Sequence, residues 1–201
     1  MGIITEISLQ KRNKSRANVY VDGEFAVALE TVTLLERGLK KGEQIDLDKL
    51  KIIAEESDKE GAFRRGINYL SKRSRTIKEI SDYLEGKGYS ELAVNHAINK
   101  LTEYGYLGDE ELAQSHVGVY GARRGKKRIR QDLLRRGVDR ELVESAIGEL
   151  GDQRDVALAQ AEKYLKSREF DSRKLSAHLM SKGFEWEDIN YVIRALGGKE
   201  E

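Results

Sequence analysis

The residues best suited to act on a partner are the cations of one basic stretch. Residues 121–150 read GARRGKKRIRQDLLRRGVDRELVESAIGEL, in which Asp132 and Asp139 are the acids found among the many Lys and Arg side chains up to Arg140. Apolar residues keep helical spacing beneath this charge, beginning with Ile129 and Leu133. One face of the stretch is therefore expected to pack and the other to bind an anionic surface.

A helix that begins near Lys126 and buries Ile129 and Leu133 would hold these cations outward. Asp132 is the acid within reach of them on that helix, so their mutual repulsion would cost folding energy unless a partner supplied anions. The alternative is a solvated face, which is how most charge runs end. The predicted binding residues are Arg123, Arg124, Lys126, Lys127, Arg128, Arg130, Arg135 and Arg136, followed by Lys72, Arg73 and Arg75 near the corresponding turn upstream.

Patterns typical of catalysis are weak. Residues 121–126 resemble a phosphate-binding loop, but they have one residue too few between the glycines and no strand before them. His96, His116 and His178 have no second metal ligand three or four residues away. We therefore predict no catalytic residue, no metal and no cofactor, and we expect a protein that is not an enzyme.

Composition narrows the class of protein. The 201 residues include 36 basic and 35 acidic side chains, so the net charge of +1 does not by itself indicate a nucleic-acid-binding protein. The absence of cysteine excludes disulfides, thiolate zinc sites and cysteine nucleophiles. No apolar run approaches the roughly 20 residues of a membrane span, and no signal-peptide pattern follows Met1. We expect a cytoplasmic, soluble monomer without membrane contact.

The elements that position the cations recur along the chain. One apolar skeleton appears three times, at periods of 49 and 46 residues, and each copy predicts a helix, a glycine that ends it, an apolar residue and a second helix. Glycine is expected there because the left-handed conformation after a helix costs other residues about 1 kcal/mol or more. The equivalent residues are Ile80, Leu84, Gly88, Tyr89, Val94, Ala97, Ile98 and Leu101; Ile129, Leu133, Gly137, Val138, Val143, Ala146, Ile147 and Leu150; and Leu175, Leu179, Gly183, Phe184, Ile189, Val192, Ile193 and Leu196.

A first helix precedes each copy of the skeleton. Ala62 and Tyr69 match Ala157 and Tyr164, and the middle copy has its first helix at residues 109–121. Thr76 with Glu79 forms the pattern of a capping box, in which each side chain bonds the backbone of the other. Further side-chain N-caps are expected at Ser90, Asp109, Asp139, Asp152 and Asp171.

The first sixty residues differ in kind. Alternating apolar residues at 3–9, 18–21 and 24–29, with Asp22-Gly23 as a hairpin turn, predict a three-stranded sheet. Lys11, Arg12, Lys14 and Arg16 fill the first connection, which is either a second contact or a solvated loop. A short helix follows, and a longer helical pattern runs from Leu47 toward Arg73 with weak points at Gly61 and Gly66.

These patterns predict a mainly α protein. It has a small N-terminal β-rich subdomain of three strands, followed by three tandem three-helix repeats in an extended, curved array. The predicted domains are residues 1–60 for the sheet and its helix, and 61–107, 108–150 and 151–198 for the three repeats.

Four ordered motifs in this framework resemble those of the RecX family, the regulators of the RecA recombinase. YLSKRSRTIKEI at 69–80 is similar to the opening motif of that family, GYLGDEELA at 105–113 to its joint, and RIRQDLLRRGV at 128–138 to its middle helix. RNKSRANVYVDGEF at 12–25 looks like the strand-rich extension of some members. Gly108, Gly118 and Gly121 depart from the family pattern, but none lies in the basic helix.

The resemblance implies a non-enzymatic regulator of homologous recombination and DNA repair, within the SOS response. Such a protein lies along the groove of the RecA–DNA filament, blocks protomer addition and lowers ATPase and strand-exchange activity. An extended array could contact several protomers at once, so weak contacts would combine into strong filament binding. The anionic surface facing the cations would then be either acidic side chains or phosphates.

Two other functions stay open at this stage. Three-helix units with a basic helix also resemble helix-turn-helix modules, so the protein could bind single- or double-stranded DNA directly. Direct binding would weaken linearly with the logarithm of salt concentration. Few aromatic residues lie on the basic faces to stack single strands, which disfavours this reading. A bare structural scaffold would bind neither DNA nor filament.

Overall fold

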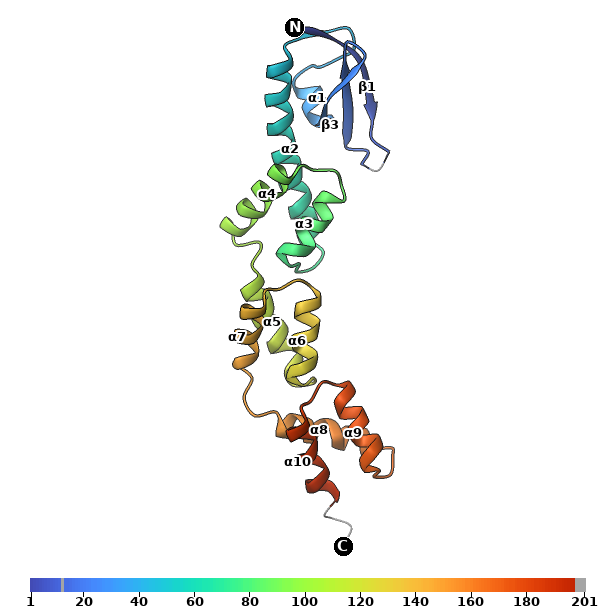
Figure 1. Ribbon diagram of the computed structural model, residues 1–201, viewed down its shortest axis with the longest axis vertical. Helices are drawn as coiled ribbons and strands as arrows, with labels where there is room; N and C mark the ends of the chain where they lie inside the picture. Colours follow the sequence, from blue (N-terminus) through green and yellow to red (C-terminus); the bar gives the residue numbers. More distant parts are fainter. Residues whose placement is uncertain (12, 198–201) are drawn as a thin grey trace. The chain divides into compact units, whose positions relative to one another are not determined.

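The computed structural model describes residues 1–11 and 13–197, which fold into two compact units. The first unit is Met1–Leu107, and the second begins at Gly108 (Figure 1). Arg12 of the predicted basic connection and Gly198 at the predicted end of the third repeat lie outside the described residues. Within these bounds, no helix combines the length and apolar content that a membrane span requires.

The N-terminal sheet contains the three predicted strands and a fourth. Strands β1 (Gly2–Leu9), β2 (Arg16–Val21), β3 (Glu24–Glu30) and β4 (Gln44–Ile45) form an antiparallel sheet in the order β3-β2-β1-β4. Asp22 and Gly23 form the β2–β3 turn with φ of 54° and 89°, the left-handed pair that suits a two-residue hairpin. Sequence pattern missed β4 because two residues show no alternation.

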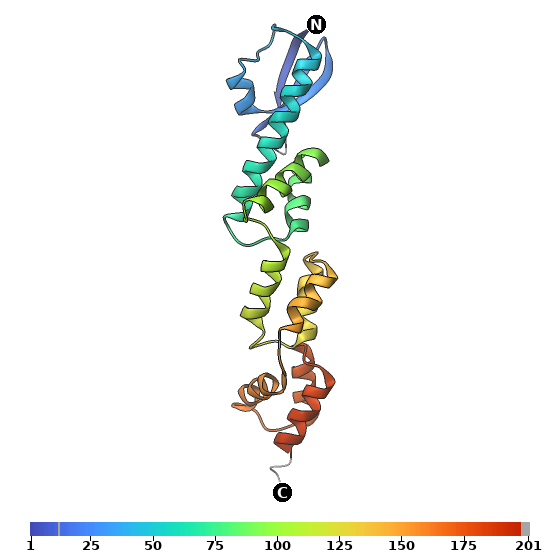
Figure 2. The same cartoon turned by 90° about the vertical axis from the view of Figure 1, so that its left-hand side faces the viewer.

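Two helices complete the N-terminal part of the first unit. Helix α1 (Thr31–Glu36) is short, and helix α2 (Leu47–Leu70) is unbroken over 24 residues. One part of α2 lies beside β3, and its later part packs against α4 (Glu91–Glu103) (Figure 2). Gly61 and Gly66 do not weaken α2. A Cβ at Gly61 would lie 2.7 Å from the Glu30 side chain, and one at Gly66 would lie 2.8 Å from Leu101. These glycines therefore let other elements approach α2 closely.

Buried polar groups join the sheet to the first three-helix domain. Arg16 was predicted in a basic loop, but it begins β2, is 3% exposed and forms an ion pair with Asp58 of α2 at 2.5 Å. The Tyr89 hydroxyl donates to the Glu30 carboxylate at 2.8 Å. Burial and this bond raise the pKa of Tyr89 to about 12. Because such groups are costly to bury unpaired, they fix how the two parts dock.

The three-helix repeats follow the predicted alignment. The first domain consists of the end of α2 with α3 (Ile77–Glu85) and α4 (Glu91–Glu103). The second consists of α5 (Asp109–Tyr120), α6 (Lys126–Arg135) and α7 (Arg140–Gly148), and the third of α8 (Arg154–Leu165), α9 (Ser172–Ser181) and α10 (Trp186–Gly197). The sheet and each of the three domains have a hydrophobic cluster of their own.

Burial agrees at five of the seven apolar positions of the superposition, where each side chain is at most 5% exposed. It differs at the other two positions: Leu101 is buried but Leu150 and Leu196 are half-buried, and Ile147 is buried but Ile98 and Ile193 are half-buried. The buried equivalents are Ile80, Ile129 and Leu175; Leu84, Leu133 and Leu179; Tyr89, Val138 and Phe184; Val94, Val143 and Ile189; and Ala97, Ala146 and Val192.

Helix boundaries match most of the predicted signals. Gly88, Gly137 and Gly183 have φ between 84° and 87°, which confirms that each ends its helix in the left-handed conformation. The capping box at Thr76 and the caps at Ser90, Asp139 and Asp171 are also confirmed. The prediction for Asp109 was wrong, because Gly108 takes that N-cap position. Gln153 is the N-cap of α8, but the Asp152 carboxylate accepts a hydrogen bond from the Arg154 N–H at 3.0 Å, so Asp152 caps this helix from one residue further upstream. Helix α5 continues through Gly118 without a break.

The second and third domains are joined through backbone. The N–H groups of Gly125 and Lys127, at the start of α6, donate to the carbonyls of Lys182 and Gly183, at the end of α9, at 3.0 and 3.1 Å. Unpaired amides at one helix start therefore meet unpaired carbonyls at another helix end. A Cβ on Gly125 would overlap the Gly183 carbonyl, and a Cβ on Gly183 would overlap Arg128.

This joint makes a prediction about two glycines with the same backbone conformation. Gly88→Ala should lower the free energy of unfolding by about 1 kcal/mol, because the left-handed strain is its main cost. At Gly88 the nearest atom to a new Cβ is 3.9 Å away. Gly183→Ala should cost about 2 kcal/mol more, because its Cβ also forces α6 and α9 apart. Urea unfolding of both variants measures the difference, and equal losses would contradict a tight joint.

Candidate anion-binding surface

Helix α6 begins with cations at its positive end. Lys126, Lys127 and Arg128 occupy the first turn, which contains no acid, and the N-cap Gly125 offers no capping side chain. Cations are unfavourable at a helix N-terminus, where the macrodipole presents partial positive charge. The carbonyls from the end of α9 satisfy two backbone donors here, so the sequence needs no acidic cap. The side chains of Lys126, Lys127 and Arg128 are therefore not needed to cap the helix and can interact with groups outside it.

One buried carboxylate organises three of the predicted arginines. Asp132 is 6% exposed, and its oxygens accept from Arg124 at 2.6 Å and from Arg135 at 3.0 Å. Arg128 lies 3.5 Å from the same carboxylate. Three guanidinium groups around one negative charge leave a local excess of positive charge. The predicted repulsion is therefore reduced at this site, although it is not removed.

Arg130 has a partner that the sequence analysis did not identify. Its guanidinium donates two hydrogen bonds to Glu144 of α7, at 2.7 and 2.9 Å. This bidentate pair lowers the pKa of Glu144, mainly through the hydrogen bond. The partner was missed because Glu144 lies on the next helix, beyond the reach of an intrahelical pairing rule. Arg130 is consequently the most neutralised of the predicted cations on α6.

Three further cations of the second domain, Arg123, Lys126 and Lys127, are less tightly paired. Among residues 1–11 and 13–197, no carboxylate forms an ion pair with Arg123 or Lys127, and both side chains are exposed. Lys126 also has no ion pair within this range, but it borders a depression that contains Asp152, Glu185 and Asp188. Arg123 and Lys127, with the loosely paired Arg128, are the cations most available to an external anion.

An arginine stacks on a tyrosine in every repeat, at the turn after the first helix. Arg75 covers the ring of Tyr69, Arg124 that of Tyr120 and Arg168 that of Tyr164, with guanidinium-to-centroid distances of 4.0, 4.3 and 4.6 Å. The basic residues at this turn therefore stabilise the fold as well, since each cation–π contact contributes about 1 kcal/mol to the free energy of unfolding. The sequence showed that a basic residue recurs at this turn, but it did not show that the arginine stacks on a tyrosine.

The predicted cations of the first domain lie in the connection between α2 and α3. Lys72 and Arg73 are exposed, and Arg73 approaches Glu79 at 3.8 Å. Arg75 is half-buried beneath its contact with Tyr69. Lys72 is therefore the most accessible of the three. All three residues belong to the first unit, whereas the cations on α6 belong to the second.

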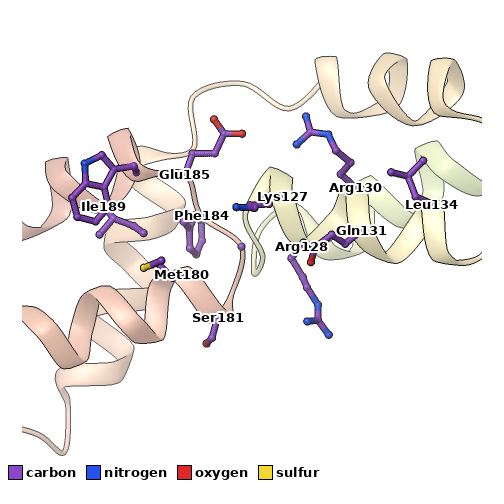
Figure 3. Close-up of a pocket in the computed structure, with 12 residues that line it drawn as sticks. Lys127, Arg128, Arg130, Gln131, Leu134, Met180, Ser181, Phe184, Glu185 and Ile189 are labelled. Atoms are coloured by element: carbon purple, nitrogen blue, oxygen red, sulfur yellow. The ribbon is translucent and has the colours of Figure 1, made fainter.

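A groove runs between α6 and the α9–α10 turn, with a volume of about 540 Å³. Lys127, Arg128, Arg130, Gln131 and Leu134 line it from α6, as Figure 3 shows. Apolar side chains of the third domain form the opposite wall. They are Met180, Phe184, Trp186 and Ile189. Few aromatic residues were expected near the cations, and Trp186 was not among them because it belongs to the next repeat.

The histidines show no arrangement for metal binding. The described ranges contain no cluster of three His, Asp or Glu side chains able to hold a metal ion. His116 stacks at 4.5 Å against Tyr120, and His178 at 4.3 Å against Tyr164. Burial lowers the pKa of His116, and the nearby positive charge of Arg136 lowers it further. Both imidazoles therefore act as packing groups beside the tyrosines.

The arrangement around Asp132 makes a stability prediction. Asp132→Asn keeps the side-chain shape but removes the charge that three arginines share, so the free energy of unfolding should fall by about 2 kcal/mol. Glu144→Gln is the matched control, because the exposed pair with Arg130 should contribute less than about 1 kcal/mol. Urea unfolding measures both variants. A loss for Asp132→Asn no larger than that for Glu144→Gln would show that Asp132 does not organise the surface.

Comparison with known proteins places the whole chain in one family. Four family models match in order: the regulatory protein RecX N-terminal domain at residues 2–46, and the first, second and third RecX three-helix domains at residues 62–101, 109–147 and 152–193. These matches cover the sheet, the basic helix and both walls of the groove.

Individual relatives agree with this match. A protein named regulatory protein RecX from Clostridium perfringens is 33% identical, over 100% of this chain and 99% of the relative, and one from Bacillus licheniformis is 33% identical over 96% and 77%. A crystal structure of regulatory protein RecX has a TM-score of 0.63 at 26% identity, covering 96% of this chain and 98% of that one. The crystal structure of RecX from Lactobacillus salivarius has a TM-score of 0.63 at 28% identity, covering 70% and 97%. The chain therefore belongs to the RecX family of regulatory proteins.

Proposed function

We propose that this chain is a non-enzymatic regulator of homologous recombination that binds the RecA–DNA filament and lowers its ATPase and strand-exchange activity. The observation that carries the proposal is the surplus of cations at the start of α6, where the free protein gains little from them. Arg123 and Lys127 have no ion pair among the described residues, and Arg128 shares one carboxylate with two other arginines. Membership of the RecX family supports the same partner.

The cations do not contribute equally to the proposed contact. Lys127, Arg128 and Arg123 form its centre, because they are exposed and weakly paired. Arg124, Arg135 and Arg136 lie around Asp132 or near it and add positive potential at the edge. Lys126, Arg130, Lys72, Arg73 and Arg75 remain proposed contacts of lower weight. A set of weak contacts of this kind favours a polymeric partner, which can engage several of them together.

Direct DNA binding by the three-helix domains, in the manner of helix-turn-helix modules, agrees less well with the charges at the starts of their last helices. In a helix-turn-helix module, the N-terminal residues of the recognition helix approach the bases and the backbone phosphates. The first turn of the last helix of each domain contains acids instead, although in α7 the first residue is Arg140. These acids are Glu91 in α4, Glu141 in α7, and Glu187 and Asp188 in α10. Carboxylates at this position would repel phosphate, so the basic surface of α6 is the better candidate.

A charge reversal tests the proposal. Lys127→Glu combined with Arg128→Glu should raise the concentration needed to inhibit the RecA ATPase on single-stranded DNA by about tenfold or more, because two central contacts become repulsive. Arg130 is a poorer target, since reversing it would also break its pair with Glu144.

The control for this experiment is Lys163→Glu combined with Lys166→Glu, which makes the same charge change at exposed positions at the end of α8. Circular dichroism should show unchanged helicity in both double variants. Inhibition that stays undiminished after reversal of Lys127 and Arg128 would remove the start of α6 from the contact. Absence of any effect of the natural sequence on the ATPase would contradict the proposed function itself.

A further inference from the structure

The groove beside α6 combines charge with exposed apolar surface. Met180 and Trp186 are each 59% exposed and Leu134 is 40% exposed, whereas Phe184 and Ile189 beneath them are buried. Large apolar side chains gathered in a concave site are typical of binding surfaces, since a solvated face gains nothing from them. In Figure 3, Met180 and Phe184 lie across the groove from Leu134 and Gln131.

Positive charge borders this apolar surface on one side. Lys127 and Arg128 lie on the α6 wall, and neither is neutralised as Arg130 is by Glu144. The ligand should therefore carry negative charge beside an apolar group. Tryptophan, methionine and arginine are also the residues enriched in the cores of protein–protein contacts.

The same groove is poorly suited to nucleic acid. Trp186 is its one exposed aromatic ring, while the rest of its exposed apolar surface is thioether and aliphatic. Stacking of successive bases needs several aromatic platforms. An acidic peptide can place its apolar side chain on Met180 and Trp186 while its carboxylates lie toward Lys127 and Arg128.

We infer that the groove between α6 and the α9–α10 turn is a docking site for an acidic protein segment that inserts an apolar side chain. This inference rests on the proposed function, because it identifies the partner surface opposite the α6 cations as protein carboxylates in place of phosphates. The backbone joint between Gly125 and Lys182 holds the two walls of the groove together, so the site is present before the segment arrives.

Trp186 provides the measurement, because it is the single tryptophan of the chain. The whole 201-residue chain is titrated with the acetylated peptide DEDLFDED, which contains no tryptophan. Binding should move the Trp186 emission to shorter wavelength and saturate at or below millimolar peptide. The peptide DEDGSDED, which lacks the apolar anchors, and KRKLFKRK, which has the opposite charge, should bind about tenfold more weakly or not at all.

Substitutions test whether both walls of the groove bind the peptide. Lys127→Glu with Arg128→Glu, and separately Leu134→Ser with Met180→Ser, should each weaken binding of DEDLFDED about tenfold. The control Lys163→Glu with Lys166→Glu should leave it within about twofold. All the substituted side chains are exposed, so unchanged helicity is expected and is checked by circular dichroism.

Several results would overturn the inference. They are equal binding of DEDGSDED, preferential binding of a short oligothymidylate, or no saturable shift with DEDLFDED. Peptide binding without any effect on the RecA ATPase would refute the proposed function and leave the groove assignment standing. ATPase inhibition that depends on Lys127 and Arg128 but not on Leu134 and Met180, together with no peptide binding, would refute the groove assignment alone.

Discussion

The backbone contact between the start of α6 and the end of α9 is the constraint on which the basic surface depends. It pairs amides at the positive end of one helix with carbonyls at the negative end of another, so the opposite partial charges of the two helix dipoles attract each other. Gly125 and Gly183 make the approach possible, because a side chain at either position would collide with the other helix. The contact sets Trp186 and Met180 beside Lys127 and Arg128.

The charge that this surface exposes depends on which of its cations pair with acidic residues in the folded protein, as well as on the sequence of the basic stretch. Asp132 is a buried acid that anchors Arg124 and Arg135, and Glu144 neutralises Arg130 from the neighbouring helix. What remains exposed is a smaller set of cations than the composition of the stretch suggests. An ordered, partly neutralised surface of this kind can select for an anionic partner by geometry, since the anchored side chains lose little further freedom on binding.

Sequence reasoning predicted the repeat well and the side-chain contacts poorly. Helical spacing, glycine stops and caps are local signals, and they agreed over three copies, so the cores at Ile80, Ile129 and Leu175 could be identified. Glu144 and Trp186 reach the basic helix from other elements, and no local pattern encodes those contacts. Arg16 was misread for the same reason, because its partner Asp58 lies on a distant helix. The stacking of arginine on tyrosine could likewise be recognised only from the three-dimensional structure.

Binding of the labelled 201-residue chain to two ligands at physiological ionic strength distinguishes a filament partner from a bare DNA partner. One is single-stranded DNA coated with RecA, and the other is the same DNA without protein. The coated DNA is expected to bind at least about 100-fold more tightly, because several weak contacts act together on the filament. Equal or tighter binding to bare DNA, with an affinity that falls linearly with the logarithm of salt concentration, would contradict this expectation.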